Sequence, residues 1–264
     1  MKKFLVAILI VVILVVFIGI EILGTSYPFA KSGDADIPIL MYHNVSSWDL
    51  SFSDDNKSLT VKPEDFSTQM DYLYKNGFTP ITLKELNLIW QEKMSMPPKP
   101  IVLTFDDGDY GVYKYAYPVL KKYNFHFVVF LITRWIPIHT NFYMGKKEIL
   151  EMLDSELVEI GAHTRNHVNL KKASPIKTLY EVCTSKRDIK KLLNYDATSF
   201  CFPFGWYDKF AIATLKIDGY TMATITTYGF ANGSQGPYLL KRIKTDGREG
   251  LQSFISKLKD LPSQ

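Results

Sequence analysis

An apolar run leads directly into two carboxylates in the stretch PIVLTFDDG, which extends from Pro100 to Gly108. The run has the length and the β-branched content of a buried strand, and the glycine permits a sharp turn after it. Two adjacent carboxylates at a strand end point to different sides, so one can bind a cation while the other stays free as a base. Asp and Gly are also common in surface loops and helix N-caps. The triplet alone therefore does not decide between a reactive site and a loop.

Short apolar runs followed by amphipathic stretches repeat on both sides of this segment. Strands are predicted at residues 37–42, 100–105, 127–132, 157–162, 199–202, 221–226 and 238–243, and helices at 63–76, 83–92, 112–123, 146–153, 176–193 and 209–218. Thr82 and Glu85 have the spacing of a capping box, and Pro63 suits the first turn of a helix. Repeated βα units indicate parallel strands with helices outside. About seven such units favour an α/β barrel over a short open sheet.

Chemically suggestive side chains stand immediately after several of these predicted strands. In parallel α/β folds the reactive groups gather at the carboxyl ends of the strands. The residues in such positions are His43, Asp106, Asp107, His163, His167 and the segment from Pro203 through Phe204 to Gly205. The sequence therefore predicts that they meet at one end of the barrel.

His163 and His167 are four residues apart, a spacing that places both imidazoles on one face of a helix or turn. Such a pair can arise by accident. Together with a carboxylate from another strand end, however, it forms a ligand set for a divalent metal with open coordination positions. Zinc is the default ion for two imidazoles and one carboxylate, and another first-row metal would fit the same set.

The composition argues against a nucleic-acid-binding protein. The net charge of +4 is small, and the Lys and Arg residues are scattered rather than clustered along one element. An aromatic content of 14% suits both a packed core and a surface on which sugar rings stack. Cys183 and Cys201 are the only cysteines, and the sequence leaves open whether they are free thiols or one bridge.

The N-terminus carries Lys2 and Lys3 ahead of an apolar stretch at residues 4–20. About twenty helical residues span roughly 30 Å of hydrocarbon, and paired lysines favour the cytoplasmic side. A cleaved signal peptide is the alternative, although its apolar core is normally about 7–15 residues long. We therefore expect one transmembrane helix as a membrane anchor over residues 1–24, a linker over 25–36 and one extracytoplasmic domain over 37–264. Cleavage would give a secreted protein.

The motifs from Thr104 to Gly108 and from His163 to His167 resemble those of the polysaccharide deacetylases of carbohydrate esterase family 4. The resemblance extends from about residue 37 to residue 243. It implies a distorted (β/α)7-type barrel and a hydrolase that removes N-acetyl groups from an N-acetylglucosamine polymer. It also implies the site: Asp106 as general base, Asp107, His163 and His167 as metal ligands, and a segment Pro203, Phe204 and Gly205 along the groove, with a backbone N–H on the oxyanion. Trp206 follows this segment and is the candidate for a sugar contact.

The sequence departs from the pattern of many family members in two places. Cys201 stands where they carry the arginine that orients the base, and no histidine follows His167, where they carry the general acid. We expect His43 to be the acid and Arg242 to supply the guanidinium. This order resembles the subgroup that deacetylates poly-β-1,6-N-acetylglucosamine, a polysaccharide of bacterial biofilms.

Three other functions remain open at this level. A peptidoglycan or chitin-type deacetylase would use the same scaffold on β-1,4-linked chains. A non-catalytic polysaccharide-binding surface protein would keep the fold without the reaction. A metallophosphoesterase fits less well, because two metals usually require more ligands than the motifs provide.

Overall fold

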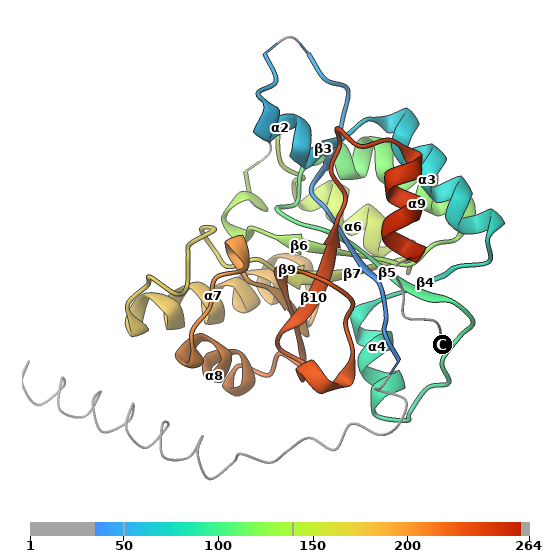
Figure 1. Ribbon diagram of the computed structural model, residues 1–264. Coiled ribbons are helices and arrows are strands. Elements are labelled where there is room, and N and C mark those ends of the chain that lie inside the picture. Colours follow the sequence, from blue (N-terminus) through green and yellow to red (C-terminus); the bar gives the residue numbers. More distant parts are fainter. Residues whose placement is uncertain (1–34, 50, 139, 260–264) are drawn as a thin grey trace, which may run out of the picture.

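The computed structural model describes residues 35–49, 51–138 and 140–259 (Figure 1). The predicted membrane anchor over residues 1–24 and nearly all of the predicted linker lie outside these residues. Among the helices described, none has both the length and the apolar character that crossing a membrane requires. The anchor therefore stays a prediction from the sequence.

Seven parallel strands form a closed barrel. They are β1 (Ile39–Tyr42), β5 (Pro100–Phe105), β6 (Phe127–Leu131), β7 (Val158–Ala162), β8 (Ser199–Cys201), β9 (Met222–Tyr228) and β10 (Leu240–Lys244). Neighbours follow the order β1-β10-β9-β8-β7-β6-β5, and β5 pairs again with β1, which closes the barrel. The α/β barrel with parallel strands that the sequence predicts is thus confirmed, with strand limits that differ by up to two residues.

Three short strands add to this frame. β4 (Thr79–Ile81) pairs with the first half of β5, whereas β6 pairs with its second half. β2 (Asn44–Val45) and β3 (Thr60–Val61) form a separate parallel pair. None of the three was predicted, because two or three residues are too few to show an alternation of apolar and polar side chains.

The outer helices are α2 (Asp54–Leu59), α3 (Pro63–Lys75), α5 (Tyr117–Tyr123), α6 (Lys146–Leu153), α7 (Pro175–Leu193), α8 (Lys209–Ile217) and α9 (Leu251–Lys259) (Figure 1). The single helix predicted over residues 112–123 is wrong in detail. Residues Val112–Ala116 form a π-helical turn before α5 begins. Pro118 stands in the first turn of α5, where its missing N–H is tolerated. Pro63 likewise opens α3, as predicted.

Successive side chains along each strand belong alternately to two hydrophobic clusters, one inside the barrel and one outside it. Val102 and Val128 belong to the inner cluster, whereas the adjacent Leu103 and Val129 belong to the outer one. This follows from the pleat of a strand, which points successive side chains to opposite faces. Towards the carboxyl ends of the strands the buried set includes polar side chains, among them Thr104, Asp106, Thr224 and Arg242.

The helix α4 (Leu83–Trp90) closes the barrel at the end where the strands begin (Figure 1). Leu86 and Ile89 share the inner cluster with Ile39, the first residue of β1. The predicted capping box is present, since Thr82 and Glu85 exchange hydrogen bonds of 2.6 and 3.1 Å. One end of the barrel is therefore filled with apolar side chains, which leaves the other end for chemistry.

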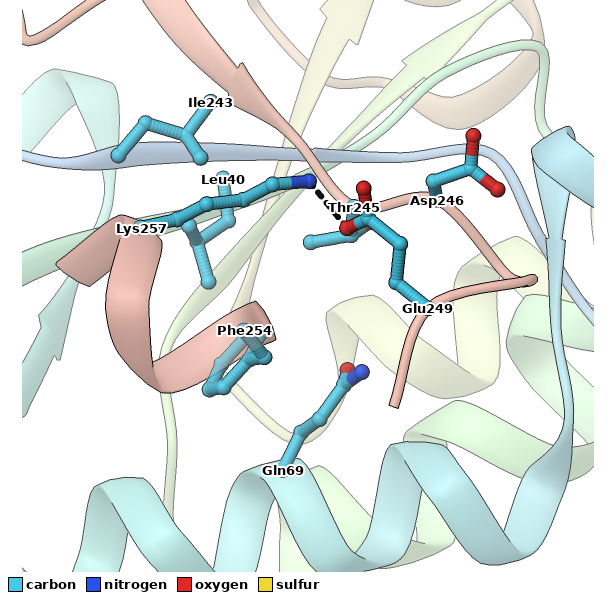
Figure 2. A pocket seen from close by; sticks show the side chains of 8 residues that line it. All are labelled: Leu40, Gln69, Ile243, Thr245, Asp246, Glu249, Phe254 and Lys257. Atoms are coloured by element: carbon cyan, nitrogen blue, oxygen red, sulfur yellow. Dashed lines mark hydrogen bonds and ion pairs between the residues drawn. The ribbon is translucent and has the colours of Figure 1, made fainter. Parts of the chain in front are cut away.

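Figure 2 shows a small pocket between α3, α9 and the strands β1 and β10. Its lining includes Leu40 and Ile243, which belong to the outer cluster, and Lys257 pairs there with Glu249. This pocket therefore lies outside the barrel. The helix α9, which was not predicted, covers this side through Phe254, whose ring meets that of Tyr72 of α3.

Candidate active site

Asp106 follows β5 and is bound by Arg242 of β10. Both side chains are buried, and the two guanidinium nitrogens Nη1 and Nη2 donate to Oδ1 and Oδ2 of Asp106 at 2.7 Å each. Arg242 also donates to the Ile225 carbonyl at 3.0 Å and to Thr104 Oγ1 at 3.0 Å. The structure thus brings Arg242 to the predicted base and fixes the guanidinium through residues of β9, of β5 and of the end of β5.

The electrostatics of this pair keep Asp106 ionised. Burial raises the pKa of its carboxyl, but the attraction and hydrogen bonds of Arg242 outweigh burial and hold that pKa well below the ordinary value. Cys201, in place of the family's usual arginine, accepts from Arg242 Nη2 at 3.1 Å. Cys201 and Cys183 are both free thiols, so they form no bridge.

Asp107, His163 and His167 form a second group beside Asp106. The Nε2 atoms of His163 and His167 lie 3.5 and 3.4 Å from Asp107 Oδ1. This oxygen is buried and makes no hydrogen bond within the described chain. Ligand atoms around a tetrahedral zinc ion lie roughly 3.3–3.6 Å apart, given bonds of about 2.0–2.2 Å. The three side chains therefore fit a divalent cation.

Asp106, His163 and Cys201 also lie close together, and as residue types they too could hold a metal. Both oxygens of Asp106, however, accept hydrogen bonds from Arg242, and the Cys201 sulfur accepts another. Within this group only His163 keeps a ligand atom, Nε2, that makes no hydrogen bond, and that atom faces Asp107. The cation site is therefore better assigned to Asp107 and the two histidines.

The two histidines are held in different ways. His163 is buried, and its Nδ1 lies 2.7 Å from the Cys201 carbonyl, which turns Nε2 towards Asp107. Burial lowers the pKa of His163, but Cys201 and the two carboxylates outweigh it and raise that pKa to about 10. Burial and the neighbouring His163 lower the pKa of His167 to about 4. A metal ion would have to displace the proton that His163 binds in its absence.

His43 lies at the end of β1, with Nε2 at 3.9 Å from Asp106 Oδ2. Burial lowers its pKa from the ordinary value, and the carboxylate of Asp106 opposes that change. The predicted acid and the predicted base, 63 positions apart in the sequence, are thus brought together by the pairing of β1 with β5.

The backbone at the site adopts left-handed conformations in residues other than glycine. The φ angles are 69° at Asp107, 62° at Thr164, 55° at His167 and 60° at Phe204. Such conformations are uncommon outside glycine and persist only where the surroundings impose them. Gly108, with φ of 81°, makes the sharp turn predicted after the carboxylates.

The segment Pro203–Gly205 forms a short 3-10 turn after β8. Thr226 Oγ1 donates to the Phe204 carbonyl at 3.2 Å, and a Cβ on Gly205 would lie 2.1 Å from that same Oγ1. The Phe204 side chain is exposed, and its ring centroid lies 4.6 Å from that of His167. Trp206 is exposed as well, with Lys171 Nζ at 5.0 Å from its ring. The Phe204 ring is thus open to a ligand beside the cluster, and the exposed Trp206 ring follows two positions later in the chain.

Sequence reasoning missed the support of the histidine loop by α7. Asn166 donates through its backbone N–H and its Nδ2 to the two oxygens of Glu181, both at 2.8 Å. Arg165 Nε and Thr133 Oγ1 donate to Asp188 Oδ2 at 3.2 and 3.1 Å. The only available signal was two acidic residues seven positions apart on one helix, a spacing that places them on one face.

Comparisons with known proteins agree with this geometry. A family model described as polysaccharide deacetylase matches residues 93–223, which contain both motifs. YxkH of Bacillus subtilis, provisionally named a polysaccharide deacetylase, is 31% identical over 210 residues, which cover 80% of this chain and 71% of that protein. The poly-beta-1,6-N-acetyl-D-glucosamine N-deacetylase of Staphylococcus epidermidis is 31% identical over 200 residues, 68% of each chain.

Among solved structures, the Streptococcus pyogenes deacetylase PplD in complex with acetate is similar with a TM-score of 0.79 at 26% identity. The match covers 85% of this chain and 99% of that one. With the barrel, the carboxylate pair and the histidine pair in place, the chain belongs to the polysaccharide deacetylase family, carbohydrate esterases that act on N-acetyl groups.

Proposed function

We propose that the enzyme is a metal-dependent N-deacetylase of an extracellular N-acetylglucosamine polymer, with poly-β-1,6-N-acetylglucosamine as the substrate. The observation that carries this proposal is the position of His43, 3.9 Å from Asp106 at the end of the first barrel strand. The acid thus comes from the front of the domain, as in the subgroup that the sequence resembles. The Staphylococcus epidermidis relative, whose name specifies this polymer, supports the same substrate.

Asp107, His163 and His167 would hold the metal, for which zinc is the first choice. The support is the buried Oδ1 of Asp107, which accepts no hydrogen bond within the described chain and faces both imidazoles. When bound, a divalent metal supplies a Lewis acid that polarises the acetyl carbonyl and lowers the pKa of water.

In this proposal Asp106 accepts the proton of the attacking water. Because Arg242 keeps the carboxylate ionised, Asp106 holds that proton weakly and releases it readily. His43 donates a proton to the sugar nitrogen as the C–N bond breaks, so that acetate and a free amine leave. The backbone N–H of Phe204 donates to the carbonyl oxygen as negative charge develops there.

We also propose that residues 1–24 anchor the enzyme in the cell membrane, with the domain outside. The support is the sequence of Lys2 and Lys3 followed by the apolar stretch at 4–20. Protease added to intact cells is expected to digest the domain while the protein fractionates with membranes. A shorter protein in the medium would instead indicate a cleaved signal peptide, and full protection from protease would contradict the proposal.

Acetate release from defined oligomers tests the substrate. The full chain is expected to release acetate from β-1,6-linked N-acetylglucosamine oligomers, and to lose this activity with a chelator and regain it with zinc. Release from β-1,4-linked oligomers alone would reassign the enzyme to peptidoglycan or chitin. Binding of the polymer without any acetate release, with metal present, would favour a non-catalytic binding protein.

A further inference from the structure

His167 lacks the support that fixes the other histidine of the cluster. His163 is oriented by the Cys201 carbonyl at its Nδ1, whereas no hydrogen bond to Nδ1 of His167 is found in the part of the chain that the structure describes. His167 also has a left-handed backbone, with φ of 55°. Apart from the Phe204 ring at 4.6 Å, what fixes its position is therefore the backbone of the preceding residues, Thr164 to Asn166, and what binds them.

Glu181 of α7 binds this backbone at Asn166. Its side chain is fully buried, and its two oxygens accept the backbone N–H and the Nδ2 of Asn166 at 2.8 Å each. Lys177, which is 46% exposed, adds an ion pair of 2.8 Å to Oε1. A buried carboxylate is costly unless it is paired, and here all its contacts are with its own helix and the histidine loop.

Asp188 binds the same loop one position earlier. It accepts from Arg165 Nε and from Thr133 Oγ1, and the loop carbonyls of Thr164 and Arg165 accept from the N–H groups of Thr133 and Arg134. The loop is therefore held at successive residues up to Asn166. Glu181 makes the last of these contacts before His167, and its own side chain is fully buried.

We propose that Glu181 is a positioning residue that sets His167 for metal binding through the backbone of Asn166. The proposal rests on the metal site assigned above to Asp107, His163 and His167. Loss of an outer partner of a metal ligand typically weakens metal binding about 10–100-fold. Glu181 acts one residue further from the ion, through the main chain rather than through a ligand ring.

Two substitutions with side chains of similar size distinguish the effect of the Glu181 hydrogen bonds from that of its volume. Glu181→Gln can accept the Asn166 N–H through Oε1 and donate through its amide to the Asn166 side chain, once that side chain has rotated. Glu181→Met fills the same space and suits a helix, but leaves the buried N–H of Asn166 without an acceptor. Lys177→Met removes only the exposed ion pair.

The measurement is the zinc dissociation constant of the metal-free full chain, determined by competition with a chromophoric chelator. We expect Glu181→Met to bind zinc about 10–100-fold more weakly, and Glu181→Gln and Lys177→Met to remain close to the unmodified protein. Glu159→Met is the matched control, because it removes another buried carboxylate that accepts a backbone N–H, at the opposite end of the barrel. It should lower the melting temperature without changing zinc affinity.

Zinc binding by Glu181→Met equal to that of the unmodified protein would overturn the role of Glu181. Absence of zinc binding by the unmodified protein would instead overturn the metal site on which the proposal rests. If Glu181→Met does not fold, Glu181→Asp replaces it, since it keeps the charge but withdraws the carboxylate by one methylene. Unchanged zinc affinity in Glu181→Asp would then count against the proposal.

Discussion

At the scale of single residues, Asp106 meets two side chains with separate proposed tasks. Arg242 binds both carboxylate oxygens from the barrel interior, and His43 lies 3.9 Å from one of them. The guanidinium sets the charge and the orientation of the carboxylate, whereas the imidazole is the proposed proton donor to the leaving nitrogen. Substitution of Arg242 should therefore lower the stability of the fold, whereas substitution of His43 should lower the rate of amide hydrolysis.

Arg242→Met is expected to lower the free energy of unfolding by about 3–5 kcal/mol at pH 7, because it leaves the Asp106 carboxylate buried and unpaired. The folded-state pKa of Asp106 is depressed, so the stability that the pair contributes is present above the unfolded pKa of about 3.9 and lost as pH falls towards the folded value. In urea unfolding, the difference in unfolding free energy between the variant and the unmodified protein should narrow below about pH 4. Lys190→Met, which removes an exposed pair with Asp196, is the control.

His43→Gln is expected to lower amide hydrolysis about 10²–10⁴-fold, as for the loss of a general acid. An activated ester such as 4-nitrophenyl acetate needs no proton on its leaving group, so its hydrolysis should be largely retained. Asp106→Asn, which removes the proposed base, should lose both activities. Equal losses of amide and ester hydrolysis in His43→Gln would show that His43 is not the acid.

The sequence sufficed to nominate these residues, because Asp106 and His43 stand at the ends of apolar runs and Arg242 was inferred from the family arginine that Cys201 replaces. It did not show the contacts that arrange them. Arg242 and Asp106 are 136 positions apart, and only the closed barrel brings them together. Glu181 and Asp188 could not be singled out either, because an acidic residue on a helix gives no sign of being buried against a distant loop.

At the scale of elements, α4 is joined to the barrel by one buried carboxylate. Glu159 of β7 accepts the N–H of Lys84 at 2.8 Å through Oε2, in the first turn of the helix. Its Oε1 and the nearby Ser199 Oγ are buried and make no hydrogen bond among the described residues. The helix that closes the barrel is thus held at its N-terminus by a group that is only half satisfied.

Glu159→Gln is expected to stabilise the protein, and more at pH 8 than at pH 5. Burial raises the folded-state pKa of Glu159, so ionisation costs stability at high pH, and that cost disappears as pH falls through the folded pKa. The glutamine keeps an acceptor for Lys84 and offers an N–H to Ser199. Thermal unfolding at the two pH values measures the effect. A variant that is less stable than the unmodified protein, and more so at pH 8, would contradict the prediction.

Helices and strands long enough to show a repeat of apolar side chains were predictable from the sequence, and shorter elements were not. The strand β5 matches its predicted limits, from Pro100 to Phe105. The strand β4 escaped prediction because three residues around Pro80 carry no alternation. The π-helical turn at Val112–Ala116 has the same apolar spacing as an α-helix over such a short distance, so its different hydrogen bonding left no mark in the sequence.

At the scale of the whole molecule, the barrel divides its two ends between packing and chemistry. Apolar side chains and α4 fill the end where the strands begin, and the polar cluster lies where they finish. The count of βα units predicted the barrel, but not which strands close it. Closure depends on β1 pairing with both β5 and β10. No local sequence pattern specifies which strand edges pair.

Metal binding should stabilise the whole fold, because its ligands come from two separate strand ends. At a zinc concentration about one hundred times the dissociation constant, the expected gain is about 2.7 kcal/mol. Melting curves of the metal-free chain, with and without zinc, measure it. Asp107→Asn should abolish the gain, whereas the exposed control Asp154→Asn should keep it. A gain of the same size in both variants would place the zinc elsewhere.

The closure of the barrel by β1 and β10 has a consequence for synthesis. His43 leaves the ribosome about 200 residues ahead of Arg242, which at about 5–20 residues per second is an interval of roughly 10–40 s. During this interval β1 lacks its neighbour β10, and Asp106 lacks the guanidinium of Arg242. A chain truncated before β10, by early termination or by a protease, would still carry both histidines of the cluster and yet lack a complete catalytic centre. Under the proposed mechanism, hydrolysis would require the finished polypeptide.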